Sequence, residues 1–444
     1  MPVGIRERVA IVFMTVSVIA TLGLGGAVAY TLTRPAQVAI AAIAPETSGG
    51  NSSTTVGGAA GTAGTAGSAG SSTGGTSAGA LSTKTTGVNN GLITVGGIYD
   101  ETGAVDATVE RDTVRAYFNK VNAAGGVNGY KFRLIDCDSA FDPSRAHECA
   151  QRLISQGVLA IVGWLSPMGE DNEVQYFTQQ GIPVVGGLGT PHEYTSPLSF
   201  PTTANLLTFG TATGMHAREM GVKSPGVVLL NLPFIAPVKK ALLDSLKKNG
   251  ITPASVDEVD ATKADYTDIV IKLRQENADS VIAGLDPYSY GRFFQAMDRQ
   301  DYHPKFAGLG LDKPSANQQY GQSVYGAESL TPVLEPADHQ SDPSIQDYIN
   351  TVRTYFPSQV GALDVYSEGD WVAAKMFVEA IRHIQGTPNR KTLVDALNSV
   401  RNFATGIEPP LSYRAGNSHD PNRCFQYIHN VNGEWKTYSG WKCF

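Results

Sequence analysis

The strongest constraint on the fold is a regular alternation of strand and helix patterns that begins at residue 91. The run LITVGGI (92–98) is apolar almost throughout, as in a strand that is buried on both faces. In the segment that follows, Val109, Val114 and Phe118 recur at helical spacing, and a pair of glycines ends the pattern. Further strand and helix patterns follow in the same order to about residue 187. Such alternation predicts parallel strands joined by right-handed helical crossovers.

The same rhythm restarts after residue 206. Between residues 206 and 311 the strand patterns GVVLLN, SVDEVD, DSVIAGL and KFAGLGL each follow a helix pattern. Two more helices are expected within 361–403. The tail CFQYIHNVNGEWKTYSGWKCF (424–444) predicts a β-hairpin with Asn432 and Gly433 at its turn. We therefore predict an α/β protein whose globular part has two similar lobes.

The first 34 residues have the pattern of a membrane signal. Arg6 and Arg8 precede an uncharged, largely apolar stretch (9–33) that is long enough to span a bilayer. Because positive charge stays on the cytoplasmic side, the rest of the chain is expected to be exported. We predict a transmembrane anchor at 1–34, and the alternative is a signal that is cleaved within 39–44. The globular part would then be extracytoplasmic and attached to the cell membrane through its N-terminal helix.

Residues 35–90 are predicted to form a flexible, disordered linker. The stretch is dominated by Gly, Ala, Ser and Thr. These residues bury too little apolar surface to offset the conformational entropy that folding removes. The linker would hold the globular part away from the membrane.

The charge pattern excludes nucleic acid as a partner. The formal net charge is −7, and the Lys and Arg residues form no cluster. Binding to a phosphate backbone requires clustered positive charge.

The motifs that would indicate an enzyme, a nucleotide or a metal are incomplete. VGGIYDETG (95–103) lacks the glycine spacing of a dinucleotide loop and places Asp100 and Glu101 where a phosphate would lie. GWLSPMG is not the nucleophile elbow of a hydrolase, and HECAQ lacks the second histidine of a zinc protease. DCDSAFD lacks the glycine and the closing glutamate of a calcium loop. We expect no enzymatic activity, no catalytic residue, no cofactor and no metal.

The four cysteines suit an exported protein with two disulfide bonds. Cys137, Cys149, Cys424 and Cys443 allow three pairings, and four free thiols are the alternative. We favour Cys137–Cys149 and Cys424–Cys443, because each pair closes a local loop.

Six loops at the expected carboxyl ends of strands are rich in Gly, Ser, Thr, Asp and aromatic residues. They are YDETG, WLSPMGED, GLGTPHE, NLPF, LDPYSY and GLDKPS. Open α/β sheets bind their ligands at these ends. The mixture of amides, hydroxyls, carboxylates and rings suits a small polar ligand.

Four stretches together resemble the branched-chain amino-acid-binding family, the type I periplasmic solute-binding proteins of ABC transporters. They are FNKVNAAGGVNGYKFRLIDCDSAFDPSRAHECAQRLI, VLAIVGWLS, FTQQGIPVVGGLGTP and DYTDIVIKLRQENADSVIAG. The resemblance extends from about residue 92 to the C-terminal hairpin. It implies an α/β fold of two Rossmann-like lobes, joined by three crossovers, that close on a ligand. Lobe I would comprise 91–208 and 334–408, and lobe II 209–333 and 409–444.

The resemblance also implies where the ligand would lie. In the family, two loops of lobe I hold the ligand carboxylate through amides and hydroxyls; they align with Ser166, Pro167, Met168, Leu188, Gly189 and Thr190. The facing residues of lobe II would be Phe234, Asp286, Tyr288 and Asp312. Further wall residues would be Tyr99, Asp100, Trp164 and Tyr366.

Two positions depart from the family pattern. Pro167 stands where a serine is usual, and proline supplies neither a hydroxyl nor an amide donor. The amine-binding glutamate of the family aligns with Gly310. The expected ligand is a small polar solute, an amino acid or a similar carboxylate or amide, whose identity stays open.

The function that the resemblance implies is delivery of this solute to the permease subunits of an ABC transporter. The alternative is a ligand-sensing receptor on the same fold that signals to a membrane partner.

Overall fold

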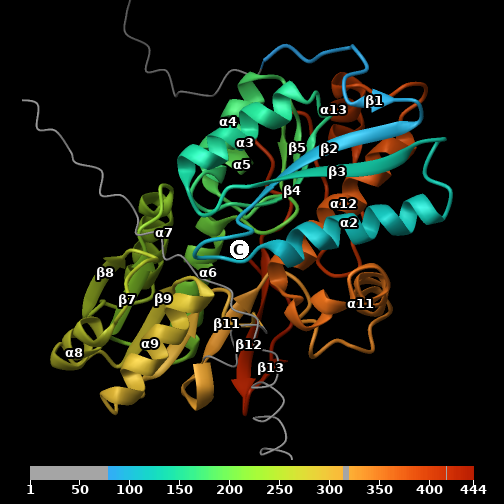
Figure 1. Ribbon diagram of the computed structural model, residues 1–444. Coiled ribbons are helices and arrows are strands. Elements are labelled where there is room, and N and C mark those ends of the chain that lie inside the picture. The colour runs from blue at the N-terminus through green and yellow to red at the C-terminus, as the bar shows by residue number, and fades with distance from the viewer. Residues whose placement is uncertain (1–78, 314–319, 417) are drawn as a thin grey trace, which may run out of the picture. The chain divides into compact units, whose positions relative to one another are not determined.

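The computed structural model describes residues 79–313, 320–416 and 418–444. They form two α/β lobes, each built around its own sheet (Figure 1). The predicted two-lobed α/β architecture is thereby confirmed. The predicted transmembrane segment and most of the predicted linker lie outside the described residues.

No helix in the described part of the chain is long and apolar enough to cross a membrane.

The sheet of lobe I follows the order β1-β2-β4-β5-β6, and β3 also pairs with β2. All of these pairs are parallel except β1 with β2. The strands are β1 (Val88–Asn89), β2 (Leu92–Tyr99), β3 (Lys131–Asp138), β4 (Ile161–Leu165), β5 (Val184–Val185) and β6 (Ser199–Phe200). Helices cover both faces of this sheet, which is why β2 reads as an apolar run.

The helices of lobe I come from two separated parts of the chain. They are α2 (Thr108–Ala123), α3 (Pro143–Ser155), α4 (Glu170–Gln179), α5 (Pro191–Thr195), α11 (Pro343–Tyr355), the 3-10 helix η2 (Pro357–Ala362), α12 (Val365–His383) and α13 (Arg390–Ser399). Figure 1 shows α2 beside the late helices α11 and α12, and it packs against both. The late helices therefore complete the core that the first part of the chain begins.

The sheet of lobe II follows the order β13-β12-β11-β10-β9-β7-β8, and β14 pairs with β12. The strands are β7 (Pro225–Leu230), β8 (Ser255–Val259), β9 (Ser280–Gly284), β10 (Lys305–Gly308), β11 (Glu328–Thr331), β12 (Cys424–Val431), β13 (Glu434–Thr437) and β14 (Lys442–Cys443). Strands β7 to β11 are parallel, and β12 is antiparallel to its neighbours. Its hairpin with β13 turns at Asn432 and Gly433, which both have positive φ, as predicted.

The helices described in lobe II are α6 (Leu206–Glu219), α7 (Ile235–Lys248), α8 (Thr267–Gln275), α9 (Pro287–Arg299) and the 3-10 helix η1 (Gly321–Val324). Helix α6 packs against α7, so the boundary that the sequence places at 208 falls inside a lobe II helix. In the described chain, passages between the lobes lie at 201–205, 332–342 and 400–423.

Residues 79–90, assigned to the flexible linker from composition, are packed on lobe I. The amide of Gly79 donates to the carbonyl of Thr178 (2.9 Å), and the amide of Lys391 donates to that of Ser82 (3.4 Å). Strand β1 pairs with the start of β2. These contacts use backbone groups, which small residues supply as well as large ones, so composition does not predict them.

Both predicted disulfide bonds are present. Cys137 on β3 is bonded to Cys149 on α3, and Cys424 on β12 is bonded to Cys443 on β14. The preference for local pairing is confirmed.

Candidate ligand-binding site

A cavity of about 140 Å³ lies between the two lobes, at the carboxyl ends of the lobe II strands. Lobe I contributes Val105, Phe141, Leu165, Pro167, Leu188 and Tyr366 to its wall. Lobe II contributes residues of β7, β9, β10, β11, α6 and α7, together with the loops that follow β7, β9 and β10. Open α/β sheets bind ligands beyond the carboxyl ends of their strands, so the cavity lies where the sequence predicts a site.

Glycines in the lobe II wall leave room for the cavity and for its neighbours. A side chain on Gly210 of α6 would lie 3.0 Å from the carbonyl oxygen of Val238 on α7. A side chain on Gly284 would lie 3.1 Å from the Leu229 side chain. Helices α6 and α7 thus approach closely, and no side chain fills the space at the end of β9.

Gly310, which the sequence led us to align with the family's amine-binding glutamate, is closed off by Tyr366 from lobe I. Its φ is +70°, and a Cβ there would lie 2.7 Å from the Tyr366 hydroxyl oxygen. A side chain at this position would therefore be strained and would displace Tyr366. The amine site of the family has no counterpart at this residue.

The lobe I amides that were expected to hold a ligand carboxylate already hold two carboxylates of the protein. The amides of Leu188 (2.6 Å) and Ser166 (3.1 Å) donate to Glu170. The amides of Gly189 (3.1 Å) and Thr190 (2.8 Å), and the Thr190 hydroxyl (2.8 Å), donate to Glu193. Thr190 and Glu193 form the capping box of α5. These donors are satisfied without a ligand.

Burial perturbs both of these glutamates. Burial and the nearby charge of Glu193 raise the pKa of Glu170 well above its usual range. Burial raises the pKa of Glu193 to about 7. Both carboxylates flank Gly187, whose φ of +127° and missing side chain make space for them. Both carboxyl groups therefore keep their protons to a higher pH than an exposed glutamate does.

Asp100 and Ser166 lie together, but they face the interior of lobe I. The Ser139 hydroxyl lies 2.6 Å from Asp100 Oδ1 and 2.8 Å from the Ser166 hydroxyl. The amide of Phe141 also donates to Asp100 (2.7 Å). Burial raises the pKa of Asp100 to about 6. Asp100 is thus a residue that positions a loop.

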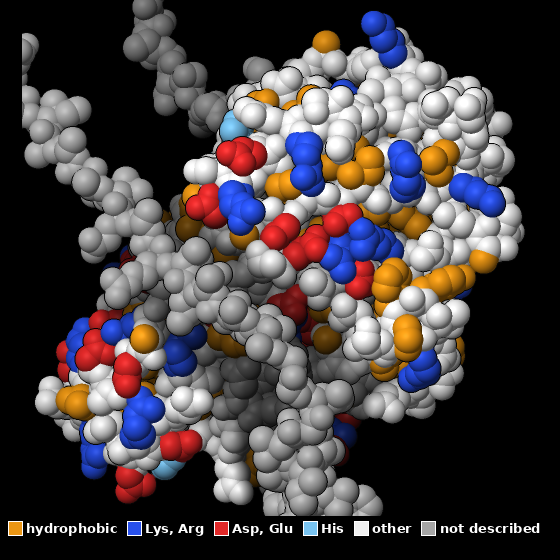
Figure 2. Space-filling model, in the orientation of Figure 1, with side chains coloured by type: hydrophobic (Ala, Val, Ile, Leu, Met, Phe, Trp, Pro, Cys, Tyr) orange, Lys and Arg blue, Asp and Glu red, His pale blue; other side chains and the backbone are white. Residues whose placement is uncertain are grey.

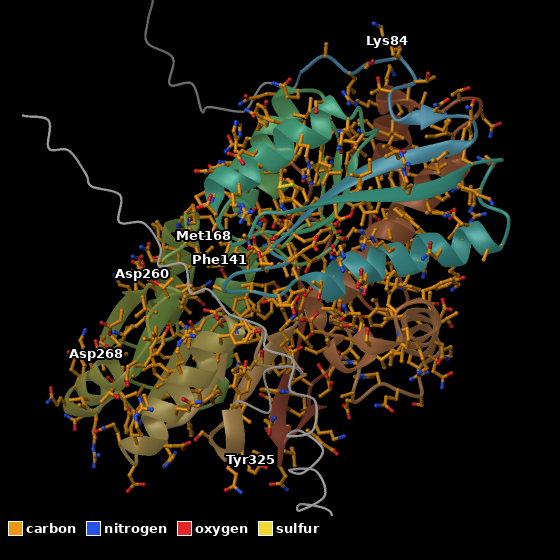
Figure 3. All side chains as sticks on the ribbon, viewed as in Figure 1. Lys84, Phe141, Met168, Asp260, Asp268 and Tyr325 are labelled. Atoms are coloured by element: carbon orange, nitrogen blue, oxygen red, sulfur yellow. A yellow bond between two sulfur atoms is a disulfide. The ribbon has the colours of Figure 1, made fainter. Side chains whose placement is uncertain are left out.

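This loop carries Phe141 into the cavity wall with an unusual backbone. Ala140 and Phe141 have φ values of 51° and 57°, which non-glycine residues rarely adopt. The amide of Ala140 donates to Asp138 (2.8 Å), as that of Phe141 does to Asp100. Figure 3 shows Phe141 and Met168 at the end of lobe I that faces lobe II. Strained backbone of this kind clusters at binding sites.

Of the residues expected in lobe II, two line the cavity. Phe234 and Asp286 do so, whereas Tyr288 is 40% exposed on α9 and Asp312 is buried near Glu335. Asp286 caps α9 by accepting from the amide of Ser289 (2.9 Å). Among the described residues its Oδ2 atom has no hydrogen-bond partner.

Tyr99 and Trp164, expected as walls, lie in the core of lobe I. Tyr99 is fully buried, and its hydroxyl would touch a side chain placed on Gly163. Trp164 packs edge-on against Phe177, with ring centroids 5.4 Å apart. Neither residue lines the cavity, and Met168, Gly189 and Thr190 do not line it either.

A buried ionic cluster at the cavity joins the two lobes. Lys313 of lobe II pairs with Asp364, the N-cap of α12, and with Glu110 of α2 (3.1 Å). Burial lowers the pKa of Lys313, but Asp364 and Glu110 outweigh this effect and raise it above its ordinary value. Burial raises the pKa of Glu110 to about 8. Lys313 therefore brings no unbalanced positive charge to the cavity.

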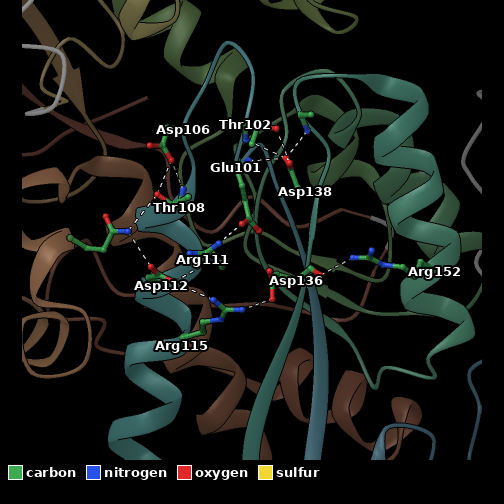
Figure 4. A network of polar contacts seen from close by, with 12 residues as sticks. Glu101, Thr102, Asp106, Thr108, Arg111, Asp112, Arg115, Asp136, Asp138 and Arg152 are labelled. Atoms are coloured by element: carbon green, nitrogen blue, oxygen red, sulfur yellow. Dashed lines mark hydrogen bonds and ion pairs between the residues drawn. The ribbon is translucent and has the colours of Figure 1, made fainter. Parts of the chain in front are cut away.

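Glu101 belongs to a partly buried network of ion pairs that connects its loop with α2 and β3 (Figure 4). It pairs with Arg111, which also contacts Asp112, while Arg115 pairs with Asp136. Figure 2 shows acidic and basic side chains side by side on this face of lobe I. Glu101 is absent from the cavity wall.

Several residues that shape the site were missed in the sequence. Lys313 lies in the GLDKPS loop, but nothing local shows that its partners come from lobe I. Glu170 and Glu193 were also missed. For Glu193 a signal was present, because T-P-H-E is a capping box.

Comparison with known proteins identifies the family. Residues 92–434 match the family described as periplasmic binding protein. The chain belongs to this family. The resemblance seen in the sequence is confirmed, and the chain is a solute-binding protein rather than an enzyme.

Periplasmic binding proteins of several specificities are similar to the chain. The Leu/Ile/Val/Thr-binding protein of Salmonella typhimurium is 23% identical over 248 residues, which are 54% of this chain and 67% of that protein. A fatty acid ABC transporter substrate-binding protein from Thermomonospora curvata has a TM-score of 0.71 at 16% identity, covering 81% of this chain and 94% of that one. A solute-binding protein from R. palustris in complex with benzoate has a TM-score of 0.69 at 15% identity, covering 79% and 96%. At these identities the structures show a shared fold.

Proposed function

We propose that the chain is an extracytoplasmic binding protein that captures a solute between its lobes and delivers it to an ABC-type permease. The observation that carries this proposal is the cavity whose wall comes from both lobes. The names of similar proteins support it, since they include a substrate-binding protein of a fatty acid ABC transporter. The residues proposed to contact the solute are Pro167, Leu188, Phe234, Asp286 and Tyr366, together with Phe141.

The proposed mechanism is closure of one lobe on the other. A solute that touches both walls is bound more tightly by the closed arrangement than by an open one, and this difference drives closure. The three passages between the lobes would act as the hinge. The ion pairs of Lys313 with Glu110 and Asp364 form across the lobes, so they favour the same closed arrangement.

The N-terminal region is proposed to keep the lobes near the permease. In this proposal residues 1–34 anchor the chain and the linker that follows allows the lobes to reach their partner. Retention of the anchor is tested by the mass of the mature chain extracted from membranes. A mature chain that begins within 39–44 would show a cleaved signal instead.

Hydrogen exchange on the full chain tests capture between the lobes. Solutes that raise the melting temperature are first found by a screen of amino acids, small carboxylates, amides and aromatic acids. A bound solute should then slow amide exchange at residues 139–141 of lobe I and at 284–286 of lobe II. Protection in one lobe alone would contradict the proposal.

Uptake measurements separate transport from sensing. Deleting the gene should abolish uptake of the identified solute, and the intact gene should restore it. Unchanged uptake with a lost transcriptional response would favour the receptor alternative.

A further inference from the structure

We infer that the solute carries an apolar group of about six carbons, and that burial of this group in lobe II, rather than capture of a carboxylate by lobe I, supplies the binding. The inference rests on the proposed function, because it names the solute class for the same cavity. It differs from the small polar solute that the sequence led us to expect.

The lobe II wall is almost entirely hydrocarbon. Leu206 and Phe209 project from α6, Val238 and Leu242 from α7, and Ile282 from β9. Water in such a space finds few hydrogen-bond partners, whereas an apolar group is transferred there favourably.

Two polar side chains of the wall, Thr213 and Lys313, are engaged within the protein. The Thr213 hydroxyl donates to the carbonyl of Phe209 on its own helix (2.9 Å). Lys313 is paired with two carboxylates of lobe I. Asp286 Oδ2 has no partner among the described residues, and it would repel rather than hold a carboxylate.

The size of the cavity sets the size of the apolar group. Its volume is about 140 Å³. An engineered cavity of about 150 Å³ lined by Leu, Ile and Phe binds benzene. A benzene ring or a chain of about six carbons is therefore a suitable occupant.

The carboxylate-binding positions of lobe I support the same conclusion. The amides of Ser166, Leu188, Gly189 and Thr190 are occupied by Glu170 and Glu193. A ligand carboxylate would have to displace a buried glutamate from these amides. An amino acid thus lacks the anchor that the family resemblance leads one to expect.

Calorimetry on the full chain in lipid nanodiscs tests the solute class. Detergent is avoided because its alkyl chain would itself enter the cavity, and empty nanodiscs serve as the blank. The probes are 1-butanol, 1-hexanol, hexanoate, benzoate and leucine. Affinity should rise roughly fourfold for each methylene group from butanol to hexanol. Leucine, whose carboxylate would lose its water without gaining a partner, should bind roughly 100-fold more weakly than hexanol.

Three outcomes would overturn the inference. Binding of leucine with no binding of hexanol would refute the solute class but leave the proposed function intact. Binding of hexanoate with no binding of hexanol would show that the carboxylate is held. If none of the probes binds, the class is wrong, and the uptake measurement then decides whether the proposed function survives.

A matched pair of variants localises the apolar group. Leu206 and Leu207 are neighbours at the start of α6, and both are partly exposed, but only Leu206 lines this cavity. Leu206→Ser should weaken hexanol binding roughly tenfold, Leu207→Ser should leave it unchanged, and Leu206→Met should restore it. Equal effects of the two serine variants would refute binding at this wall, and circular dichroism checks that both fold.

Discussion

The two walls of the cavity are built on opposite principles. The lobe I wall also presents mostly apolar side chains, but the loops that carry several of them are held by hydrogen bonds to the carboxylates of Glu170, Glu193 and Asp100. The lobe II wall is the hydrocarbon interior between two helices and a sheet, opened by small residues. The first wall is fixed by hydrogen bonds, and the second is shaped by packing.

This difference teaches that similar lobes need not share the work of recognition. Hydrogen-bonded loops resist rearrangement because each displaced carboxylate would leave buried donors unpaired. An apolar wall selects by volume and tolerates different head groups. We therefore expect lobe I to set the position of the solute and lobe II to set its size.

The largest effect is expected where the two walls meet. Lys313→Met removes the cation between Glu110 and Asp364, and breaking a buried ion pair costs about 3–5 kcal/mol. Urea unfolding followed by tryptophan fluorescence measures the loss. The matched control is Lys391→Met, whose pair with Asp395 is exposed and should contribute under about 1 kcal/mol. Equal losses would show that the cluster does not join the lobes energetically.

The stability of the protein should depend on pH through Glu193, which holds the loop behind the lobe I wall. Burial raises the pKa of Glu193 from 4.5 to about 7, so the folded state binds this proton more tightly than the unfolded state. The stabilisation is complete below pH 4.5 and is lost as the pH rises through 7; it is on the order of 3 kcal/mol.

Glu193→Gln is neutral at every pH, so its stability should fall less than that of the parent between pH 5 and pH 8. Thermal unfolding over this range measures the difference. The exposed Glu434 provides the control, because Glu434→Gln should leave the parent's pH profile unchanged. A parent-like profile in Glu193→Gln would mean that Glu193 is ionised throughout.

A smaller effect is expected at the loop that presents Phe141. Asp100→Asn weakens the hydrogen bonds from Ser139 and from the Phe141 amide, at a cost of about 1–2 kcal/mol. Solute affinity should fall several-fold, because Phe141 loses its support. Asp106→Asn, which alters exposed hydrogen bonds from Thr108, should change neither quantity. Unchanged affinity in Asp100→Asn would remove Phe141 from the site.

The smallest effect is expected at the acidic residue next in sequence. Glu101→Gln weakens a partly buried pair with Arg111, whose guanidinium keeps its contact with Asp112, so stability should change by about 1 kcal/mol. Solute affinity, measured by calorimetry, should not change. A clear loss of affinity would place Glu101 at the rim of the cavity after all.

The sequence predicts those features that depend on local order. The strands and helices follow from periodicity, the hairpin from its Asn432–Gly433 turn, and the disulfide bonds from short separation along the chain. Each of these signals lies within one segment. These features can therefore be recognised without knowledge of the tertiary contacts.

The polarity of the site depends on contacts between segments, and the sequence does not predict it. Asp100 reads as a rim residue, but Ser139 and Phe141 from the next βα loop turn its carboxylate inward. Gly310 reads as a missing acid, but Tyr366 from α12 fills its place. In both cases a residue type suited to a polar ligand serves the protein's own interior.

The Cys137–Cys149 bond has a consequence for how the solute meets lobe I. It closes a segment of the chain, with its ends 12 residues apart in sequence, that contains the left-handed residues Ala140 and Phe141. Such a covalent ring has little conformational freedom to lose when a solute arrives. The Phe141 wall is therefore preorganised in an oxidising compartment. Reduction of this bond would give the loop that carries Phe141 more conformational freedom. We therefore expect the affinity for solute to depend on the thiol–disulfide state outside the cytoplasm.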